Sequence, residues 1–390
     1  MTTIKDKDGN VLAKGTGSVR DVAQAQRIRL EGADLQGQDL HAADLSGARL
    51  FDADMTGADA RYADMTEADM RGAVLSHADL AGARLHRAEL TNADLVGSDL
   101  TDADMTRAFL DGVNLEGVDL HGTDLRGARL RFANLRHANL RGVDLRDVDL
   151  VGVDLSYADL TGAILAGANL GRVTMHQVNL DGMDLTGTDL TRADLRAASM
   201  RGTVLSAARM RGADMSNADL TGADLTRADL RGAVMGVPEL GGGPDMTGCN
   251  LTGVRLDETM ILDTHFDKAI LRDALLDRSS IHLSSFQDAD MTGVRIRDAK
   301  IGGTDMRDTI LRDSDLTDTE FNVSFDGVDL EGADMTGVYL VHPDDLAGAT
   351  GTPILTGATC AGGGPVLPPP DAATPGMESP AGPATPGMGI

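Results

Sequence analysis

The sequence predicts an all-β solenoid, in which the chain winds in square coils around a narrow core. Two observations carry this prediction. From Leu30 to Met235 every fifth residue is Leu or Met, and Ala60 is the one exception among 42 such positions. The chain of 390 residues also has no Trp, three Tyr and seven Phe. It therefore cannot fill an ordinary core with large aromatic side chains, and a repetitive core of smaller ones is the alternative.

The five-residue unit explains the shape of each coil. Of the 42 positions that lie two residues before a Leu or Met centre, 28 are Ala, and the residue between is usually Asp or Asn. A period of five fits neither an α-helix, which repeats every 3.6 residues, nor a flat strand, which alternates every two. It fits a short extended side followed by a polar or Gly corner. The centre and the small residue then point inward, the Asp points outward, and four units close a coil of about twenty residues.

The units EGADL, HAADL, TNADL and AGANL resemble the A(D/N)LxG motif of the pentapeptide-repeat proteins, over roughly residues 26–340. The resemblance implies a right-handed quadrilateral parallel β-helix. Its coils would stack at about 4.8 Å and build a rod on the order of 70 Å long.

The period is interrupted once, in GVPELGGGPDM. Three successive Gly and two Pro cannot continue a regular coil, so we expect an outward loop or kink at 236–246. It is either a tolerated insertion or a hinge or partner-binding loop. The period then resumes with Ile and Phe at several centres. One set of large centres lies about one coil apart and should stack inside one side of the helix: Met246, Phe266, Phe286, Met306 and Phe325.

The two ends are not regular. TIKDKDGNVLAKG predicts a β-hairpin with a turn at Asp-Gly-Asn, and SVRDVAQAQ predicts a short helix with Ser18 as its N-cap. A Pro-, Gly- and Ala-rich tail cannot bury a core and predicts disorder, as a linker or a docking tail. The expected organisation is a hairpin and helix cap (1–25), a regular β-helix (26–235), a loop or kink (236–246), a degenerate β-helix with a closing coil (247–360) and the tail (361–390).

Motifs of catalysis or cofactor binding are missing from the sequence. It has no HExxH, no nucleophile elbow, no P-loop and no GxGxxG between a strand and a helix. Cys249 and Cys360 form no disulfide framework or CxxC pair. The many Gly and carboxylates are explained by the repeat, and the nine His are scattered, mostly over outward positions. We therefore expect no enzyme, no cofactor and no metal site.

Charged residues twenty apart should stack into columns on the faces of the rod. One column continues to Asn139 and Asp159, and a second consists of Asp104, Asp124 and Asp144. The repeat consensus alone produces such columns, and a functional acidic surface is the alternative. The candidate acidic interaction column is Asp39, Asp59, Asp79, Asp99 and Asp119. Arginines that follow five successive centres form a candidate basic collar around the middle: Arg126, Arg131, Arg136, Arg141 and Arg146.

The net charge limits the kinds of partner that this chain can bind. With 61 acidic and 35 basic residues the chain carries −26, so direct nucleic-acid binding is not expected, because phosphates would be repelled. We expect a rigid structural or protein-interaction module with an unidentified protein partner. Within the resembling family, quinolone-resistance proteins imitate B-DNA and bind DNA gyrase, so a DNA mimic that regulates a topoisomerase is the alternative. The family also makes an end-to-end homodimer possible.

Location is the last expectation from the sequence. The first residues carry charges and no apolar leader, and no run of about 18 apolar residues exists to span a membrane. We therefore expect a cytoplasmic protein with no membrane contact.

Overall fold

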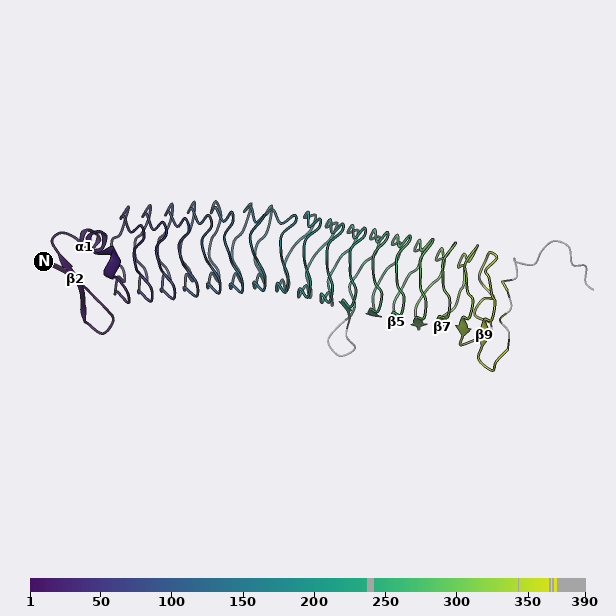
Figure 1. Cartoon of the computed structure of the whole chain (residues 1–390). Coiled ribbons are helices and arrows are strands. Elements are labelled where there is room, and N and C mark those ends of the chain that lie inside the picture. The colour runs from purple at the N-terminus through teal and green to yellow at the C-terminus, as the bar shows by residue number, and fades with distance from the viewer. Residues whose placement is uncertain (237–241, 343, 365, 367, 370–390) are drawn as a thin grey trace, which may run out of the picture.

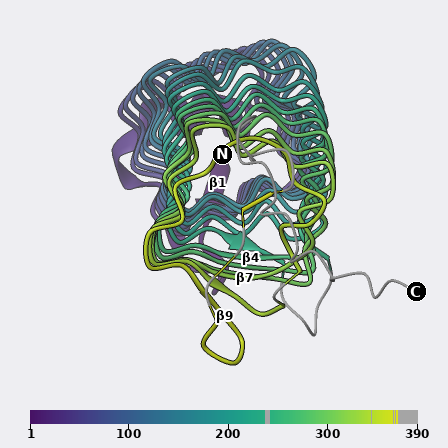
Figure 2. The same cartoon turned by 90° about the vertical axis from the view of Figure 1, so that its right-hand side faces the viewer.

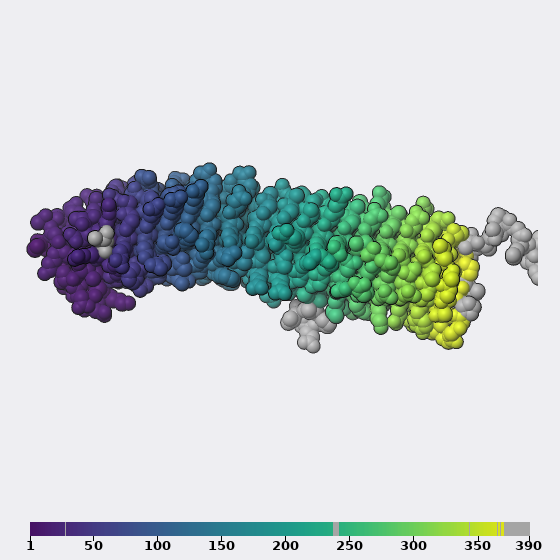
Figure 3. All heavy atoms as spheres, viewed as in Figure 1, coloured from purple at the N-terminus to yellow at the C-terminus, as the bar shows by residue number. Residues whose placement is uncertain are grey.

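A long rod of stacked coils confirms the predicted fold, a right-handed quadrilateral parallel β-helix (Figure 1). The computed structural model describes residues 1–236, 242–342, 344–364, 366 and 368–369. Viewed along the rod, the coils superimpose into a four-sided outline (Figure 2). The space-filling view shows a continuous rod with the N-terminal cap at one end and the last coils at the other (Figure 3).

Four faces run along the rod, and each is a ladder of residues one coil apart. We name them by their first outward residues: face A begins at Asp34, face B at Asp39, face C at Asp44 and face D at Arg49. Each of these residues makes a parallel bridge to the residue twenty positions later. Face A can be followed without a break from Asp34 to Thr359. Backbone hydrogen bonds between coils therefore satisfy the chain along its length.

The interior matches the inside and outside assignment made from the period. The Leu and Met centres of 30–235 are fully buried, for example Leu35 at 0% exposure. So are the Ala two residues before them, such as Ala33, except for the partly exposed Ala163. Ala60, the exception to the Leu or Met rule, is also buried. The core is a continuous column in which each side supplies one large and one small side chain.

Each corner is built by the polar residues of the unit. The second residue after a centre has a positive φ, as in Gly57 (φ 64) and Glu67 (φ 57). The outward Asp accepts a hydrogen bond at Oδ1 from the backbone amide two residues later, as Asp99 does from Thr101 at 2.9 Å. This bond stabilises the corner and explains why Asp and Asn dominate the outward position.

The N-terminal segment covers the first coil. Strands β1 (Thr2–Lys5) and β2 (Val11–Gly15) pair antiparallel, and α1 (Val19–Ala25) and a 3-10 turn (Arg27–Arg29) follow. The Ser18 hydroxyl accepts from the Asp21 amide and the Asp21 carboxylate accepts from the Ser18 amide, which is a capping box. The Asp34 amide donates to the Lys5 carbonyl at 2.8 Å, so the hairpin pairs with the free edge of the coils. In the described residues no helix is long and apolar enough to cross a bilayer.

The second half of face A forms longer strands than the first half. Ile or Phe at the centres, such as Ile281 and Phe321, favours extended backbone. Inner hydroxyls complete the corners there, as Thr264 Oγ1 donates to the Leu262 carbonyl at 3.2 Å. The strands form one seven-stranded parallel sheet: β3 (Val234–Met235), β4 (Met260–Leu262), β5 (Ser280–His282), β6 (Lys300–Gly302), β7 (Glu320–Asn322), β8 (Tyr339–Leu340) and β9 (Thr359–Cys360).

The interruption of the period leaves the register of the coils intact. Val234 pairs directly with Met260, and Asp219 with Asp245, so the six additional residues fall between Val234 and Asp245. The Gly243 amide already donates to the Asp263 carbonyl at 2.9 Å. The expected loop falls mainly on 237–241, and most of the expected disordered tail falls on 370–390; both lie outside the described residues.

Large buried side chains form the predicted ladder inside the second half of the rod. Phe266 and Phe286 stack with ring centroids 4.7 Å apart and planes at 7°. All five centres of the predicted ladder are buried. The rings therefore fill the core at this side, as expected from their one-coil spacing.

Candidate functional site

The acidic column on face B is stacked in register. Bridges join Asp39 to Asp59 and continue one coil at a time through Asp119 to Asn139. Neighbouring carboxylates are therefore about one strand spacing, 4.8 Å, apart along the rod. At this distance like charges repel by about 1 kcal/mol even at the dielectric constant of water.

In each carboxylate of the column, one oxygen accepts a backbone hydrogen bond that stabilises the fold. Its Oδ1 accepts the backbone amide two residues later, at 2.9 to 3.3 Å. Asp119 Oδ1 also accepts from the Asn139 side chain at 2.9 Å. At most the second oxygen of each residue is left for a partner. The aspartates of the column therefore stabilise the corners and also place a line of charge on the surface.

Arg61 divides the column into two kinds of carboxylate. It pairs with Asp59 at 2.7 Å and reaches Asp79 at 3.3 Å. Its hydrogen bond lowers the pKa of Asp59 to about 2. In the described part of the chain Asp39, Asp99 and Asp119 have no such arginine partner, and their outer oxygens carry the uncompensated charge of this face.

The arginines of the collar do encircle the rod, but each is paired with an aspartate. Two fold back onto the Asp of their own side, and three reach an Asp eighteen residues later in the next coil. The pairs are Arg126–Asp124, Arg131–Asp149, Arg136–Asp154, Arg141–Asp159 and Arg146–Asp144, with N–O distances of 2.5 to 3.3 Å. Exposed pairs of this kind add little stability, about 0–1 kcal/mol each. They cancel charge, so the collar is a nearly neutral belt.

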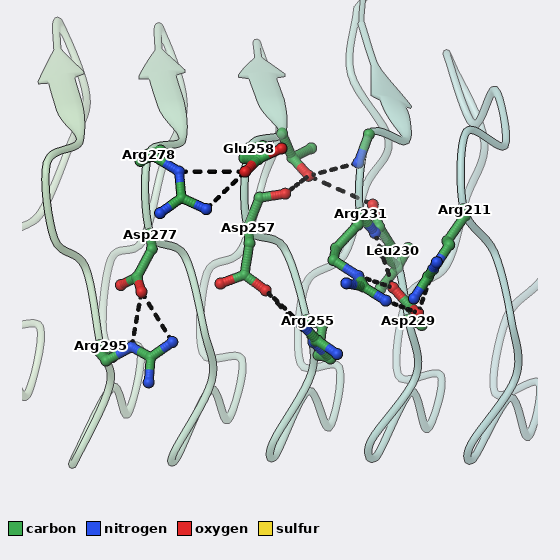
Figure 4. Close-up of polar contacts among 12 residues, drawn as sticks. Arg211, Asp229, Leu230, Arg231, Arg255, Asp257, Glu258, Asp277, Arg278 and Arg295 are labelled. Atoms are coloured by element: carbon green, nitrogen blue, oxygen red, sulfur yellow. Dashed lines mark hydrogen bonds and ion pairs between the residues drawn. The ribbon is translucent and has the colours of Figure 1, made fainter.

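A network of ion pairs along faces D and A in the second half was missed by the sequence interpretation (Figure 4). Asp277 is 6% exposed and accepts from Arg295 Nε at 2.9 Å and from Arg297 Nη2 at 3.3 Å. Burial opposes ionisation of Asp277, but the hydrogen bonds from the two arginines outweigh it and keep its pKa below the usual value.

Neighbouring coils extend this network in both directions. Glu258 accepts from Arg278 at 2.6 Å, and Asp229 lies between Arg211 and Arg231 at 2.6 and 2.8 Å (Figure 4). The sequence signal that could have revealed it is an acidic residue directly after a centre, where Thr, Ser or Arg is usual, with Arg on the neighbouring outward position.

Hollows on the rod are shallow and open to solvent. One of about 440 Å³ lies over Phe51, Asp52, Arg71, Gly72, Thr91 and Asn92. Another of about 410 Å³ lies beside His282 and Lys300, where Gly302 and Gly303 leave room. Among the residues that the structure describes, no three His, Cys, Asp or Glu side chains are grouped to hold a metal ion.

Comparisons with solved structures give several matches to parts of this chain. Rfr23 of the cyanobacterium Cyanothece 51142, a pentapeptide repeat protein, is 39% identical over 24% of this chain and 62% of its own, with a TM-score of 0.22. HetL of Nostoc sp., described as involved in heterocyst differentiation regulation, is 24% identical over 64% of this chain and 87% of its own (TM-score 0.19). QnrB1, a plasmid-mediated fluoroquinolone resistance protein, is 18% identical over 61% and 89% (TM-score 0.23). The match to Rfr23 thus covers less than two thirds of that protein.

The repeats themselves identify the family. No curated protein matches this chain. The family model for pentapeptide repeats matches overlapping segments within 23–236 and 289–342, which is more than half of the chain. These segments carry the square coils, the buried Leu and Ala ladders and the Asp-capped corners described above. The chain belongs to the pentapeptide repeat family.

Proposed function

We propose that this chain is a non-catalytic, rigid interaction module that presents a different line of side chains to partners on each face. The observation that carries the proposal is that the inward and outward residues of each unit have different roles. The two inward residues pack in the core, as Leu115 and Val113 do at 0% exposure. The outward residues differ in chemistry from face to face. Such a surface is straight and repetitive, which suits an extended partner.

Face B is the surface that we assign to the partner. Its five successive aspartates, Asp39 to Asp119, form the longest unbroken run of outward carboxylates on any face within the described residues. Asp39, Asp99 and Asp119 of this run have no arginine partner there, whereas Asp189 on face D pairs with Arg209 at 3.1 Å. A line of uncompensated negative charge favours a basic protein segment, and it raises the association rate by steering.

Three substitutions on face B test the proposal without disturbing the corners. An Asn at Asp39, Asp99 and Asp119 keeps an Oδ1 acceptor for the backbone amide and removes the charge. The control variant carries Asn at Asp104, Asp184 and Asp224 on face C. Partners captured by the full chain and identified by cross-linking should be lost from the face B variant and kept by the control. Equal capture by both variants would show that face B is not the partner surface.

A DNA mimic is the second candidate, and the same column supports it. A line of carboxylates can occupy a basic channel that normally holds phosphates. Charge density argues against it. The net charge of −26 spread over a rod of about 80 Å is about one charge per 3 Å, roughly half the density of B-DNA at one per ~1.7 Å. Arg61 within the column and the paired collar beyond it separate the free carboxylates further.

A gyrase supercoiling assay separates the two candidates. The mimic predicts inhibition, or protection from a quinolone, by the full chain at about 10 µM and low salt, where steering is strongest. The face B variant should lose the effect. No effect of the wild-type chain on supercoiling would exclude gyrase as its target, and the interaction module would stand on its own capture experiment.

A cytoplasmic location is part of the proposal. It is supported by Cys249 and Cys360, which are both free thiols, as is usual in reducing compartments. Fractionation of cells that express the full chain tests this, and recovery of the protein outside the cytoplasm would contradict it.

A further inference from the structure

The edge between faces D and A, called the D–A edge below, carries bulky side chains at several of its corners. Corner residues have positive φ, which favours Gly and tolerates Asn or Asp. On this edge Phe132, Arg172 and Arg192 occupy the corner, each with φ 58. Bulky residues are strained in this conformation. Other edges hold them too, as at Tyr62 and His77, so the D–A edge is distinguished by what its side chains present to a partner.

Phe132 exposes an aromatic ring that the core does not use. It is 64% exposed. Its ring extends over Gly152 of the next coil, with a ring carbon 2.5 Å from the position a Cβ would take. An exposed aromatic ring held against rigid backbone loses little entropy on binding and is typical of the centre of a protein interface.

Arg172 and Arg192 differ from the paired arginines of the collar. They lie one coil apart, about 4.8 Å along the edge, and both are exposed. Within the described chain neither makes an ion pair, although the five collar arginines all do. Two adjacent unpaired cations repel each other, and an anion supplied by a partner would remove that repulsion.

Charge on the same edge changes sign on the other side of Phe132. Asp52 occupies the corner with φ 54, and Glu89 lies beside the edge on face D, bridged to Asp69 and Phe109. Neither carboxylate makes an ion pair with any residue that the structure describes. Within four coils of Phe132, the described D–A edge thus carries unpaired acids on the N-terminal side and unpaired cations on the C-terminal side.

The spacing of these residues matches an antiparallel second copy. Arg172 lies two coils and Arg192 three coils from Phe132 toward the C-terminus. Glu89 lies two coils and Asp52 four coils from Phe132 toward the N-terminus. A two-fold axis beside Phe132 places Arg172 opposite Glu89, and Arg192 within one coil, about 4.8 Å, of Asp52. The two Phe132 rings then meet at the axis.

We propose that two copies of this chain associate side by side and antiparallel through the D–A edge, with Phe132 at the two-fold axis. The interface is isologous, since each copy contributes the same acids and the same arginines. Arg129 and Arg131 also lie near the axis, but they are already paired with Asp111 and Asp149. A contact between two edges is narrow, so the dimer is weak and sensitive to salt.

Sedimentation of the full chain measures this association. A monomer–dimer equilibrium is expected at about 50 mM salt, and it should weaken at least tenfold near 500 mM, where screening shortens the range of charge. Phe132→Gly should abolish the dimer while preserving the corner, because Gly accepts a positive φ. The control is Tyr62→Gly, which removes a ring of similar exposure, 63%, from a different edge; it should leave the dimer intact.

Charge exchange between two variants gives the sharpest test. Arg172→Glu with Arg192→Glu should be monomeric, and so should Asp52→Arg with Glu89→Arg. Mixing the two variants restores opposite charges on both sides of the axis, so a 1:1 heterodimer should form. A chain that is monomeric at low salt, a dimer that survives Phe132→Gly, or a mixture that stays monomeric would each overturn the proposal. An end-to-end dimer would be recognised by the second of these outcomes.

Discussion

The ring of Tyr62 lies against Gly82 of the next coil, with two ring carbons 2.6 Å from the position that a Cβ on Gly82 would occupy. His77 and Gly97 have the same relationship, with a ring nitrogen at 2.6 Å. A bulky corner side chain therefore leans toward the C-terminal coil, and a glycine there makes room for it. This coupling between residues twenty apart is invisible in a single five-residue unit.

Substitution of glycines with and without such a neighbour should give different losses of stability. Gly117 has φ 68 and nothing within 4 Å of its Cβ position, so Gly117→Ala should cost about 1 kcal/mol for backbone strain alone. Gly82→Ala adds the clash with Tyr62 and should cost about 1–3 kcal/mol more. Urea unfolding measures both. Tyr62→Ala in the Gly82→Ala background should recover the difference, and equal losses at both glycines would contradict the coupling.

Burial should decide the effect of a charge on the fold. Leu115 is 0% exposed, so Leu115→Asp places a carboxylate among stacked leucines and should lower the free energy of unfolding by about 3 kcal/mol or more. Asp119→Asn keeps the Oδ1 that accepts a hydrogen bond from the His121 amide at 2.9 Å. This variant should change the free energy of unfolding by about 0.5 kcal/mol or less. Comparable losses for the two variants would mean that inside and outside are assigned wrongly.

Acid should destabilise the rod between about pH 4 and pH 2. The pKa values of several outward aspartates are lowered in the folded chain, by Arg61 to about 2 for Asp59, by Arg146 for Asp144 and by Thr161 for Asp159. Such groups bind protons less readily when folded than when unfolded. Their contribution to the free energy of unfolding is present above the pKa of the group in the unfolded chain. It is lost as the pH falls through the pKa of the group in the folded chain. The urea midpoint should therefore drop steadily over this interval.

Arg61→Gln is the control for the acid effect. It removes the hydrogen bond that lowers the pKa of Asp59, so the variant should start less stable at pH 5 and lose less on acidification. A wild-type midpoint that stays constant between pH 4 and pH 2 would contradict the assigned shifts.

Cys249 should resist alkylation until the rod unfolds. Its Sγ donates to the Leu220 carbonyl at 2.9 Å, and burial raises the pKa of its thiol to about 12. Since the thiolate is the reactive form, both access and ionisation are suppressed. Mass spectrometry after iodoacetamide treatment in increasing urea should show modification of Cys249 only across the unfolding transition. Rapid labelling of Cys249 in the native protein would show that this part of the core opens locally.

Much of the fold was predictable because the period itself carries the geometry. A repeat of five assigns each residue to the inside, the outside or a corner, and the spacing of twenty brings Phe266 onto Phe286 and Asp39 onto Asp59. Capping of α1 by Ser18 was predictable from local sequence for the same reason, since Asp21 is only three residues away.

The charged surface was predictable only in part. The positions of Asp59 and Arg126 follow from the period, but their pairing does not. Arg126 folds back onto Asp124, while Arg131 reaches Asp149 in the next coil, and a flexible side chain can take either course from the same position in the unit. The sequence therefore overstated the collar as a band of positive charge.

Sequence alone determined the coil, its core and the line of carboxylates on face B, because these depend on which way a backbone of fixed period points each residue. Tertiary structure decided which of those charges remain free. Among the residues that the structure describes, Asp39 and Asp99 keep an unpaired outer oxygen, Asp59 does not, and Arg172 and Arg192 have no carboxylate partner. Those outcomes depend on the reach of side chains across a coil spacing of about 4.8 Å, a distance that an arginine spans and an aspartate does not.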